Sequence, residues 1–329
     1  MELRDGMFAV KLCELEHQYG LLRSRLELCQ GADHEKIRHL LADVLDDYRE
    51  NALLLEQSAE GCRSPAVAEL AGVQRDYSKR MEELLRDSRL YVTPEVEARV
   101  RALVQRHLDG EPTAYLIGEW EFYGLGLDIS PAVLIPRPDT EVLVQTVVHE
   151  LDSGADCRVL DLCAGSGCIG LAVASQVLRS RVLLGEWDEE ALKVCRQNIR
   201  RNQLSARVTS LRMDAREKPS RQLGEFDCIV SNPPYIPTAD IEPLDPSVRA
   251  HEPHLALDGG ADGLDFYRVI ADKWRDALLP NGLMAFEVGI GQADEVLRIM
   301  RANGFGDIQI VKDLHGIPRV VYGRLCKEI

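Results

Sequence analysis

The sequence has no surplus of positive charge. Its 39 lysine and arginine residues are outnumbered by 54 aspartate and glutamate residues, which gives a formal net charge of -15 at pH 7. A protein that grips duplex nucleic acid through its phosphates is normally basic on at least one face. The charge balance therefore argues against nucleic acid as the main partner, and we expect no direct nucleic-acid binding.

Metal-binding, membrane-spanning and secretory signals are also absent from the sequence. No Cys-x-x-Cys pair occurs among the 9 cysteines, and no ligand spacing indicates a metal site, so we expect buried, reduced thiols. No apolar run reaches the roughly 18–20 residues of a membrane span. The acidic N-terminus has no apolar signal core. These absences predict a cytoplasmic protein with no bound metal and no membrane partner.

The N-terminal part of the chain has the pattern of amphipathic helices. Apolar residues three and four positions apart form successive stripes, which predict an all-helical N-terminal module over residues 1–88. Thr93-Pro94-Glu95 then begins another helix, because threonine caps a helix and proline suits its first turn. The segment from Trp120 to Ile129 alternates as a β-hairpin does. We expect a linking helix and hairpin over 89–130 and a further domain over 131–329.

Strands and helices alternate in the sequence after about residue 139. Short apolar strands are expected at Val159–Leu162, Arg181–Glu186, Phe226–Ser231, Leu283–Val288 and, as a final edge strand, Val320–Arg324. Helices are expected between them at Gly170–Leu178, Glu189–Asn202, Gly263–Leu278 and Ala293–Asn303. This alternation predicts an α/β fold with a parallel sheet covered on both faces. Ligands of such folds bind at the carboxyl ends of the strands.

A glycine-rich loop, Cys163-Ala164-Gly165-Ser166-Gly167, follows the first of these strands and opens a helix. Together with Gly170 it reads Gly-x-Gly-x-x-Gly, a pattern that suits a dinucleotide as well as S-adenosylmethionine. The charge beside the loop distinguishes the two ligands. Asp161, at the strand end, would crowd a pyrophosphate but would pair with the ammonium group of S-adenosylmethionine. The loop therefore favours S-adenosylmethionine, and a tight turn without a ligand is the remaining alternative.

Acidic and aromatic residues further along the chain are candidates for binding the ribose and the adenine of the cofactor. Glu186 ends the second strand about 20 residues after the glycines, where an acid reads a ribose diol in both cofactor classes. Trp187 would lean on the adenine or else pack in the core. Asp214 would accept a hydrogen bond from the adenine amino group or else cap a helix.

The tetrapeptide Asn232-Pro233-Pro234-Tyr235 directly follows the third strand. The lone pair of an amide nitrogen is delocalised, so a substrate NH2 group needs two acceptors that hold its hydrogens and aim the nitrogen at a methyl group. Asn232 offers its side-chain carbonyl and Pro233 its backbone carbonyl. The two prolines fix the backbone, and Tyr235 offers a ring on which a planar group lies. The tetrapeptide predicts transfer of a methyl group to an amide or amino nitrogen, mainly through orientation.

From about Tyr91 onward the chain resembles the bacterial release factor protein-(glutamine-N5) methyltransferases. The resemblance rests on several motifs in order: Gly110-Glu111-Pro112-Thr113-Ala114-Tyr115-Leu116-Ile117-Gly118, Leu134-Ile135-Pro136-Arg137-Pro138-Asp139-Thr140-Glu141, the glycine loop, Asn232–Tyr235, Glu252-Pro253, and Ala256-Leu257-Asp258-Gly259-Gly260-Ala261-Asp262-Gly263-Leu264. It implies a Rossmann-like methyltransferase domain that uses S-adenosylmethionine, behind a helical N-terminal domain. It also implies that the substrate is the glutamine in the Gly-Gly-Gln motif of peptide chain release factors.

The resemblance also implies roles for particular residues. Carried over from the family, the residues that would bind the cofactor are Cys163, Ala164, Gly165, Ser166, Gly167, Glu186, Asp214 and Ala215. We expect Asp161, Trp187 and Asn232 to bind it as well. Asn232, Pro233, Pro234 and Tyr235 would form the catalytic segment and hold the substrate glutamine, with Arg137 and Glu141 at the border of the site. The chain departs from the family at Cys163-Ala164, where Gly-Thr is usual, and at Glu186, where aspartate is usual. Its first 88 residues do not follow the family pattern and form a divergent or fused module.

Other functions compete with this interpretation. A sibling enzyme would methylate a glutamine of a ribosomal protein, although the Ile135–Glu141 run favours the release-factor branch. A DNA adenine-N6 methyltransferase would use the same tetrapeptide but needs a basic recognition segment and an extruded base. An oxidoreductase that binds NAD would explain the glycine loop but leaves Asn232–Tyr235 unexplained. A non-catalytic scaffold would not need these chemical residues.

Overall fold

The computed structural model describes residues 94–151 and 154–326. The chain divides into two compact units, Met1–Leu108 and Asp109–Ile329. In the first unit the structure describes helix α4 (Pro94–Leu108), which begins at the proline predicted as its start. The helices predicted within residues 1–88 lie outside the described residues.

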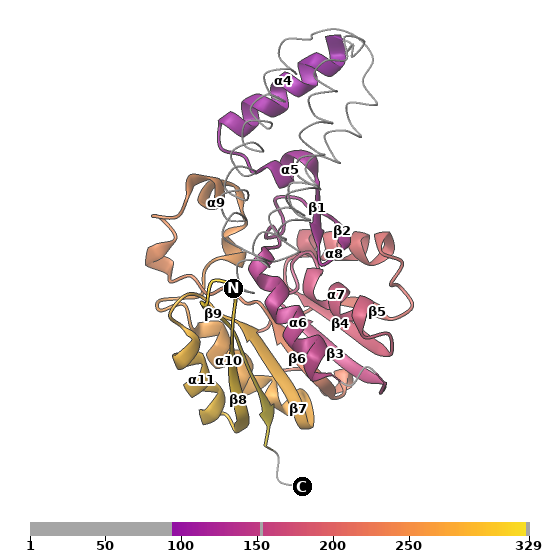
Figure 1. The fold of residues 1–329 in the computed structure, drawn as a ribbon, viewed down its shortest axis with the longest axis vertical. Helices are drawn as coiled ribbons and strands as arrows, with labels where there is room; N and C mark the ends of the chain where they lie inside the picture. Colours follow the sequence, from indigo (N-terminus) through magenta and orange to yellow (C-terminus); the bar gives the residue numbers. More distant parts are fainter. Residues whose placement is uncertain (1–93, 152–153, 327–329) are drawn as a thin grey trace, which may run out of the picture. The chain divides into compact units, whose positions relative to one another are not determined.

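The second unit is built on a seven-stranded sheet in the order β5-β4-β3-β6-β7-β9-β8 (Figure 1). The strands are β3 (Cys157–Leu162), β4 (Ser180–Glu186), β5 (Val208–Arg212), β6 (Phe226–Ser231), β7 (Leu278–Glu287), β8 (Phe305–Lys312) and β9 (Pro318–Leu325). Neighbours from β5 to β7 are parallel, whereas β9 is antiparallel to both β7 and β8. The predicted α/β, Rossmann-like fold is confirmed.

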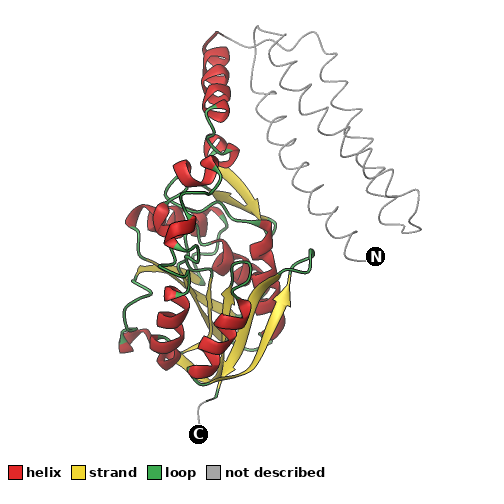
Figure 2. Cartoon of the chain, turned by 90° about the vertical axis from the view of Figure 1, so that its left-hand side faces the viewer, coloured by secondary structure: helices red, strands yellow, loops and turns green. Residues whose placement is uncertain are grey.

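The helices of this unit lie on both sides of the sheet (Figure 2). They are α5 (Thr113–Ile117), α6 (Glu141–Glu150), α7 (Cys168–Gln176), α8 (Glu189–Arg201), α9 (Pro246–His251), α10 (Asp265–Lys273) and α11 (Ala293–Ala302). Short 3-10 turns are η1 (Pro138–Thr140), η2 (Arg221–Leu223), η3 (Thr238–Asp240), η4 (His254–Ala256) and η5 (Arg275–Ala277). The predicted hairpin is confirmed as β1 (Glu119–Phe122) paired with β2 (Leu125–Asp128).

Two predictions about the C-terminal part are wrong. Val320–Arg324 is not at the edge of the sheet, because β9 lies between β7 and the edge strand β8. The helix predicted over Gly263–Leu278 ends at Lys273, and Leu278 already belongs to β7. The sequence prediction also missed β8, since polar residues interrupt Phe305–Lys312, and it missed α6.

Successive side chains of each strand point to opposite faces of the sheet, so the buried residues form one cluster on each face. One buried cluster joins Val159, Cys228, Val230, Leu283 and Ala285 to the hairpin and to α6, α7 and α8. The other cluster joins Leu160, Leu162, Ile229, Met284 and Phe286 to α10 and α11. By the same alternation, Asp161, Asn232 and Glu287 belong to the face that α6 and α7 cover.

Within residues 94–151 and 154–326, no helix is long and apolar enough to cross a membrane.

Candidate active site

The predicted site residues gather at the carboxyl ends of neighbouring strands. From β3 the chain continues to β4 on one side, while β6 pairs with β3 on the other side. This reversal of strand order is where α/β sheets place their ligands. Asp161 is the penultimate residue of β3, Glu186 ends β4, and Asn232 follows β6. The structure therefore brings the residues predicted to bind the cofactor and those predicted to bind the methyl acceptor together at the carboxyl ends of β3, β4 and β6.

Asp161 is fully buried beneath the glycine loop. Its Oδ2 accepts a hydrogen bond of 2.8 Å from the backbone N–H of Gly170, and a Cβ at Gly170 would lie only 3.1 Å from that oxygen. Among the described residues its Oδ1 has no hydrogen-bond partner. Burial, offset in part by the Gly170 bond, raises the pKa of Asp161 to about 7. A buried carboxylate oxygen without a partner fits an ammonium group of a ligand.

The glycine loop makes a sharp turn between β3 and α7. Cys163, Gly165 and Gly167 have φ angles of 59°, 55° and 83°, a region that favours glycine. A Cβ at Gly167 would lie 2.8 Å from the Leu184 side chain, so this glycine permits the close approach of α7 to the sheet. A Cβ at Gly165, by contrast, would meet no described atom within 4 Å. The loop thus leaves open space beside Gly165, in keeping with the binding of S-adenosylmethionine.

Glu186, the last residue of β4, also forms a hydrogen bond with this loop. Its Oε2 accepts from Gly165 N at 2.8 Å, and its Oε1 accepts from Trp187 N at 2.7 Å and Asp188 N at 2.9 Å. The ribose role predicted for Glu186 would use the remaining lone pairs of the carboxylate. Trp187 is 45% exposed, so the alternative of core packing is wrong. The Arg212 guanidinium carbon lies 4.5 Å from the centre of the indole ring.

The turn after β5 carries the remaining cofactor candidates. The Arg216 guanidinium forms two hydrogen bonds with the Asp214 carboxylate, of 3.0 and 2.9 Å, which hold the pKa of Asp214 below its usual value. The Ala215 carbonyl accepts from the buried Trp274 indole at 2.8 Å. Arg216 and Trp274 were not found by sequence reasoning. They fix the turn in place, and the adenine role of Asp214 stays a prediction.

The acceptor candidates continue from β6. Pro233 and Pro234 are buried, while Asn232 and Tyr235 are partly buried. Burial is the main cause that raises the pKa of Tyr235 to about 12, so its phenol is neutral at physiological pH. Tyr235 therefore presents an uncharged aromatic ring.

Glycines make room for the backbone of Pro234 and Tyr235. A Cβ at Gly259 would lie 2.7 Å from the Tyr235 Cα, and a Cβ at Gly263 would lie 2.2 Å from the Tyr235 carbonyl oxygen. A Cβ at Gly289 would lie 3.0 Å from the Tyr235 ring. The glycines of the Asp258–Leu264 motif thus have a steric reason, which the sequence prediction did not supply.

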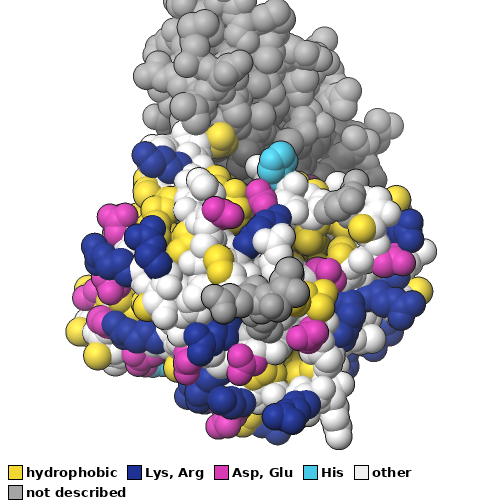
Figure 3. All heavy atoms as spheres, turned by 90° about the horizontal axis from the view of Figure 1, so that it is seen from below, with side chains coloured by type: hydrophobic (Ala, Val, Ile, Leu, Met, Phe, Trp, Pro, Cys, Tyr) yellow, Lys and Arg dark blue, Asp and Glu magenta, His cyan; other side chains and the backbone are white. Residues whose placement is uncertain are grey.

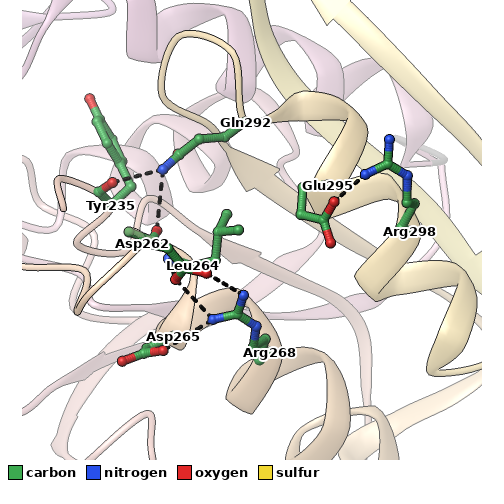
Figure 4. A network of polar contacts seen from close by, with 9 residues as sticks. Tyr235, Asp262, Leu264, Asp265, Arg268, Gln292, Glu295 and Arg298 are labelled. Atoms are coloured by element: carbon green, nitrogen blue, oxygen red, sulfur yellow. Dashed lines mark hydrogen bonds and ion pairs between the residues drawn. The ribbon is translucent and has the colours of Figure 1, made fainter.

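Gln292 links three segments around this tetrapeptide (Figure 4). Its Nε2 donates to the Tyr235 carbonyl at 2.9 Å and to the Gly263 carbonyl at 3.3 Å. Its Oε1 accepts from Gly289 N at 3.0 Å. Sequence reasoning missed Gln292, because its partners lie up to 57 residues away in the chain.

Arg137 and Glu141 have clear structural partners. Arg137 forms an ion pair with Glu252, whose side chain is 1% exposed and whose Oε2 accepts from Ile135 N at 3.4 Å. The Glu141 carboxylate accepts from Tyr123 N at 3.1 Å, and burial raises its pKa. Arg137 thus ties its segment to the Glu252-Pro253 motif, whereas Glu141 is engaged with the turn of the hairpin.

Arg319 of β9 is a charged residue near Tyr235 that the sequence prediction missed. Its guanidinium pairs with Asp139 at 2.7 Å and with Asp313 at 2.9 Å. Its positive charge and that of Arg137 both lower the pKa of Tyr235, against the larger effect of burial. Nothing in the local sequence of β9 indicates this position, because Asp139 lies in a distant segment. In the described part of the chain, no group of three or more His, Cys, Asp or Glu residues has an arrangement that would hold a metal ion.

This fold, with a glycine loop after β3 and Asn-Pro-Pro-Tyr after β6, defines an S-adenosylmethionine-dependent methyltransferase. Residues 138–243 match the family described as "Methyltransferase small domain". The catalytic domain of hMettl16, solved in complex with a MAT2A 3'UTR hairpin, is similar in fold, with a TM-score of 0.50 and 16% identity over 63% of this chain and 78% of that one. The protein is therefore an enzyme of this class.

Sequence comparison identifies the family within that class. The chain is 45% identical to the release factor glutamine methyltransferase of Geobacter sulfurreducens, over 71% of this chain and 80% of that protein. It is 33% identical to the one from Clostridium botulinum, over 83% of this chain and 99% of that protein. Residues 73–118 match the family described as "PrmC N-terminal domain". This match begins within residues 1–88, the segment that we predicted to be a divergent or fused module. The chain belongs to the release factor glutamine methyltransferase family.

Proposed function

We propose that this enzyme transfers a methyl group from S-adenosylmethionine to the side-chain amide nitrogen of the glutamine in the Gly-Gly-Gln motif of peptide chain release factors. The observation that carries the proposal is the position of Asn232–Tyr235. The tetrapeptide leaves β6 next to β3, whose end carries Asp161 and the glycine loop. The family membership of the chain supports a protein glutamine as the acceptor.

The cofactor side of the site would be formed by Asp161, residues 163–167, Glu186, Trp187 and the Asp214-Ala215 turn. The Asp161 Oδ1 would meet the ammonium group, and the Glu186 carboxylate would meet the ribose hydroxyls. Bound S-adenosylmethionine supplies an electrophilic methyl group on a sulfonium sulfur. The open space beside Gly165 fits a ligand that runs along the loop.

On the acceptor side, the Asn232 side-chain carbonyl and the Pro233 backbone carbonyl would each accept one hydrogen of the glutamine NH2 group. The Tyr235 ring would lie against the plane of the amide, with Arg137 and Glu141 at the border. The nitrogen held in this way would face the methyl group, which it would take over from the sulfonium sulfur, and it would afterwards lose a proton to solvent. Orientation of this kind supplies up to roughly 7–11 kcal/mol of a barrier in favourable cases.

The alternatives differ in the acceptor. A ribosomal-protein glutamine fits the same pocket chemistry, but the chain's relatives are release factor glutamine methyltransferases. A DNA adenine is disfavoured by the net charge of -15. On the face shown in Figure 3, basic and acidic side chains are intermixed over the described residues. We accordingly propose release factors as the partner, without direct nucleic-acid binding, and the cytoplasm as the location.

The test is a competition between acceptors. Purified enzyme and labelled S-adenosylmethionine are incubated with an unmodified release factor, with ribosomal proteins, and with DNA. We expect label on one glutamine of the release factor and none when that glutamine is replaced by alanine. Label on DNA or on a ribosomal protein, with none on the release factor, would overturn the proposal.

A further inference from the structure

Glu287, which the sequence prediction did not include, lies directly beside Asn232. It ends β7, which pairs in parallel with β6, and Phe286 is opposite Ser231. The next residues in each strand, Glu287 and Asn232, therefore follow side by side and point to the same face of the sheet. Glu287 is 2% exposed, although acidic side chains are rarely buried without a reason.

The partners of Glu287 come from separate segments. The hydroxyl of Thr140, which is 2% exposed at the start of α6, and the side-chain amide of Asn232 face its carboxylate, and both lower its pKa. Among the described residues its Oε2 has no hydrogen-bond partner. The ionisable groups that face it are Arg319 of β9, Asp139 of η1, Tyr235 after β6, Tyr267 of α10 and Cys168 of α7.

The charge of Glu287 decides which way the Asn232 amide faces. An ionised carboxylate only accepts hydrogen bonds, so Asn232 turns its NH2 group toward Glu287. Its carbonyl oxygen then points away from Glu287 and accepts from a substrate NH2 group. A protonated Glu287 has a donor of its own, and Asn232 is then able to turn its carbonyl toward Glu287 and its NH2 group toward the substrate. That reversed amide would repel the substrate nitrogen.

We propose that Glu287 is a positioning residue, whose carboxylate holds the Asn232 amide with its carbonyl oxygen toward the amide nitrogen that is methylated. The proposal rests on the proposed function only in taking an NH2 group as the acceptor. It also gives a reason for the burial of Thr140, whose hydroxyl faces the same carboxylate.

The proposal predicts a dependence on pH. Burial is the largest cause that raises the pKa of Glu287 to about 7, against the opposing effects of Thr140, Arg319 and Asn232. Because the charged form is the competent one, the single-turnover transfer rate at saturating cofactor should fall as the pH drops through about 7. In Glu287→Gln this acidic limb should disappear, because glutamine does not titrate.

A reciprocal exchange tests the contact between the two side chains. Asn232→Asp places two carboxylates together and should lower the single-turnover rate by more than about 100-fold. Glu287→Gln should lower it about 10- to 100-fold, because a glutamine amide presents either group to Asn232. In the double variant, the new glutamine at position 287 donates to the new aspartate at position 232, and the other oxygen of that aspartate is free to accept from substrate. The double variant should therefore be at least about tenfold faster than Asn232→Asp alone.

Two readouts separate positioning from a general loss of structure. S-adenosylhomocysteine affinity, measured by calorimetry, should stay within a few-fold of wild type in all variants, which shows that they fold. The nitrogen-15 shift of the Asn232 side-chain amide in the enzyme alone should titrate near pH 7 in wild type and not in Glu287→Gln. The control is Glu150→Gln, which changes a partly buried glutamate of α6 that pairs with Arg324 and should keep the acidic limb.

A double variant no faster than Asn232→Asp, or an Asn232 amide that titrates unchanged in Glu287→Gln, would overturn the role of Glu287. A different result would show that the proposed function itself is wrong. In that case the wild-type enzyme leaves the release factor unlabelled, and the same variants are then compared on whichever NH2 acceptor it does methylate. The amide titration needs no acceptor, so it tests the role of Glu287 in either case.

Discussion

The cofactor half and the acceptor half of the site each end in a buried carboxylate, but they are built differently. Asp161 and Glu287 lie on one face of the sheet, and burial raises the pKa of each to about 7. Asp161 is held by Gly170, nine residues further along the chain in the first turn of α7. Glu287 faces side chains from the start of α6 and from the segment after β6, which lower its pKa against the effect of burial. The contact that holds Asp161 is thus local in sequence, whereas the groups around Glu287 come from distant segments.

This difference indicates which property of the enzyme a substitution in each half should affect. In the cofactor half, the backbone N–H of Gly170 donates to the Asp161 carboxylate and that of Gly165 donates to the Glu186 carboxylate. The acceptor half depends on close packing of the tetrapeptide against Gly259, Gly263 and Gly289 and on Gln292. We expect changes in the first half to alter affinity for the cofactor, and changes in the second to alter the rate of transfer.

The largest effect is expected for Asn232→Ala. The substrate nitrogen loses one of its two acceptors, and the transfer rate at saturating cofactor should fall on the order of 10²–10³-fold. The affinity for S-adenosylhomocysteine should change little, because the main partner of Asn232 is the substrate. Single-turnover kinetics and calorimetry on the same preparation measure both quantities. Equal losses of rate and affinity would count against the assigned role.

Gly263→Ala should have the next largest effect on transfer. Gly263 has a φ of 74°, and its Cβ would lie 2.2 Å from the Tyr235 carbonyl oxygen, so the tetrapeptide must shift. A displacement near 1 Å costs about 100-fold in rate. The matched control is Gly304→Ala, with a φ of 86° and no described atom within 4 Å of its Cβ.

Both glycine variants carry the same backbone strain of roughly 1–2 kcal/mol. Gly263→Ala should lose more stability in urea unfolding than Gly304→Ala, because it adds the clash with Tyr235, and only Gly263→Ala should be slow in methyl transfer. Equal transfer rates in the two variants would show that the packing of Tyr235 against Gly263 does not matter for the reaction.

Asp161→Asn should weaken cofactor binding about 10- to 100-fold, the loss expected for a hydrogen bond to a charged group. Wild-type affinity should rise as the pH increases toward about 7, because the ammonium group binds the ionised form of Asp161. The variant should lack this rise. Calorimetry between pH 6 and pH 8 measures both.

The matched control for this prediction is Asp156→Asn, just before β3, which removes an exposed carboxylate paired with Arg179 at 2.9 Å. It should bind cofactor as wild type does. A pH dependence that persists in Asp161→Asn would assign the titration to another group.

The smallest effect is expected for Trp187→Ala. Aromatic contacts contribute about 0.5–1.5 kcal/mol beyond area burial, so cofactor affinity should fall roughly threefold to tenfold. Trp187→Phe should retain most of the affinity, because it keeps a ring. Fluorescence of the wild-type indole should also change on cofactor binding. Wild-type affinity in Trp187→Ala would show that the half-exposed ring packs only against Arg212.

The sequence predicted more of the cofactor half than of the acceptor half, because a contiguous pattern is visible in a sequence and long-range contacts are not. The glycine loop and Asp161 belong to one contiguous pattern, and alternation of strands and helices predicts where that pattern lies in the fold. The support of the acceptor half could not be predicted in this way. Gln292, Arg319 and Glu287 contact residues that a sheet brings together from far along the chain, and nothing in their local sequence marks them. The edge position of β8 was missed for a similar reason, because strand order is decided by pairing rather than by local pattern.

The most direct test of the division between the two halves is the cofactor affinity of four proteins. These are wild type, Asp161→Asn, Asn232→Ala and the double variant, compared by calorimetry with S-adenosylhomocysteine. The account predicts that Asn232→Ala binds as tightly as wild type and that the double variant binds like Asp161→Asn, with a coupling free energy within about 0.5 kcal/mol of zero. Weakening of cofactor binding by Asn232→Ala as large as that caused by Asp161→Asn would contradict it.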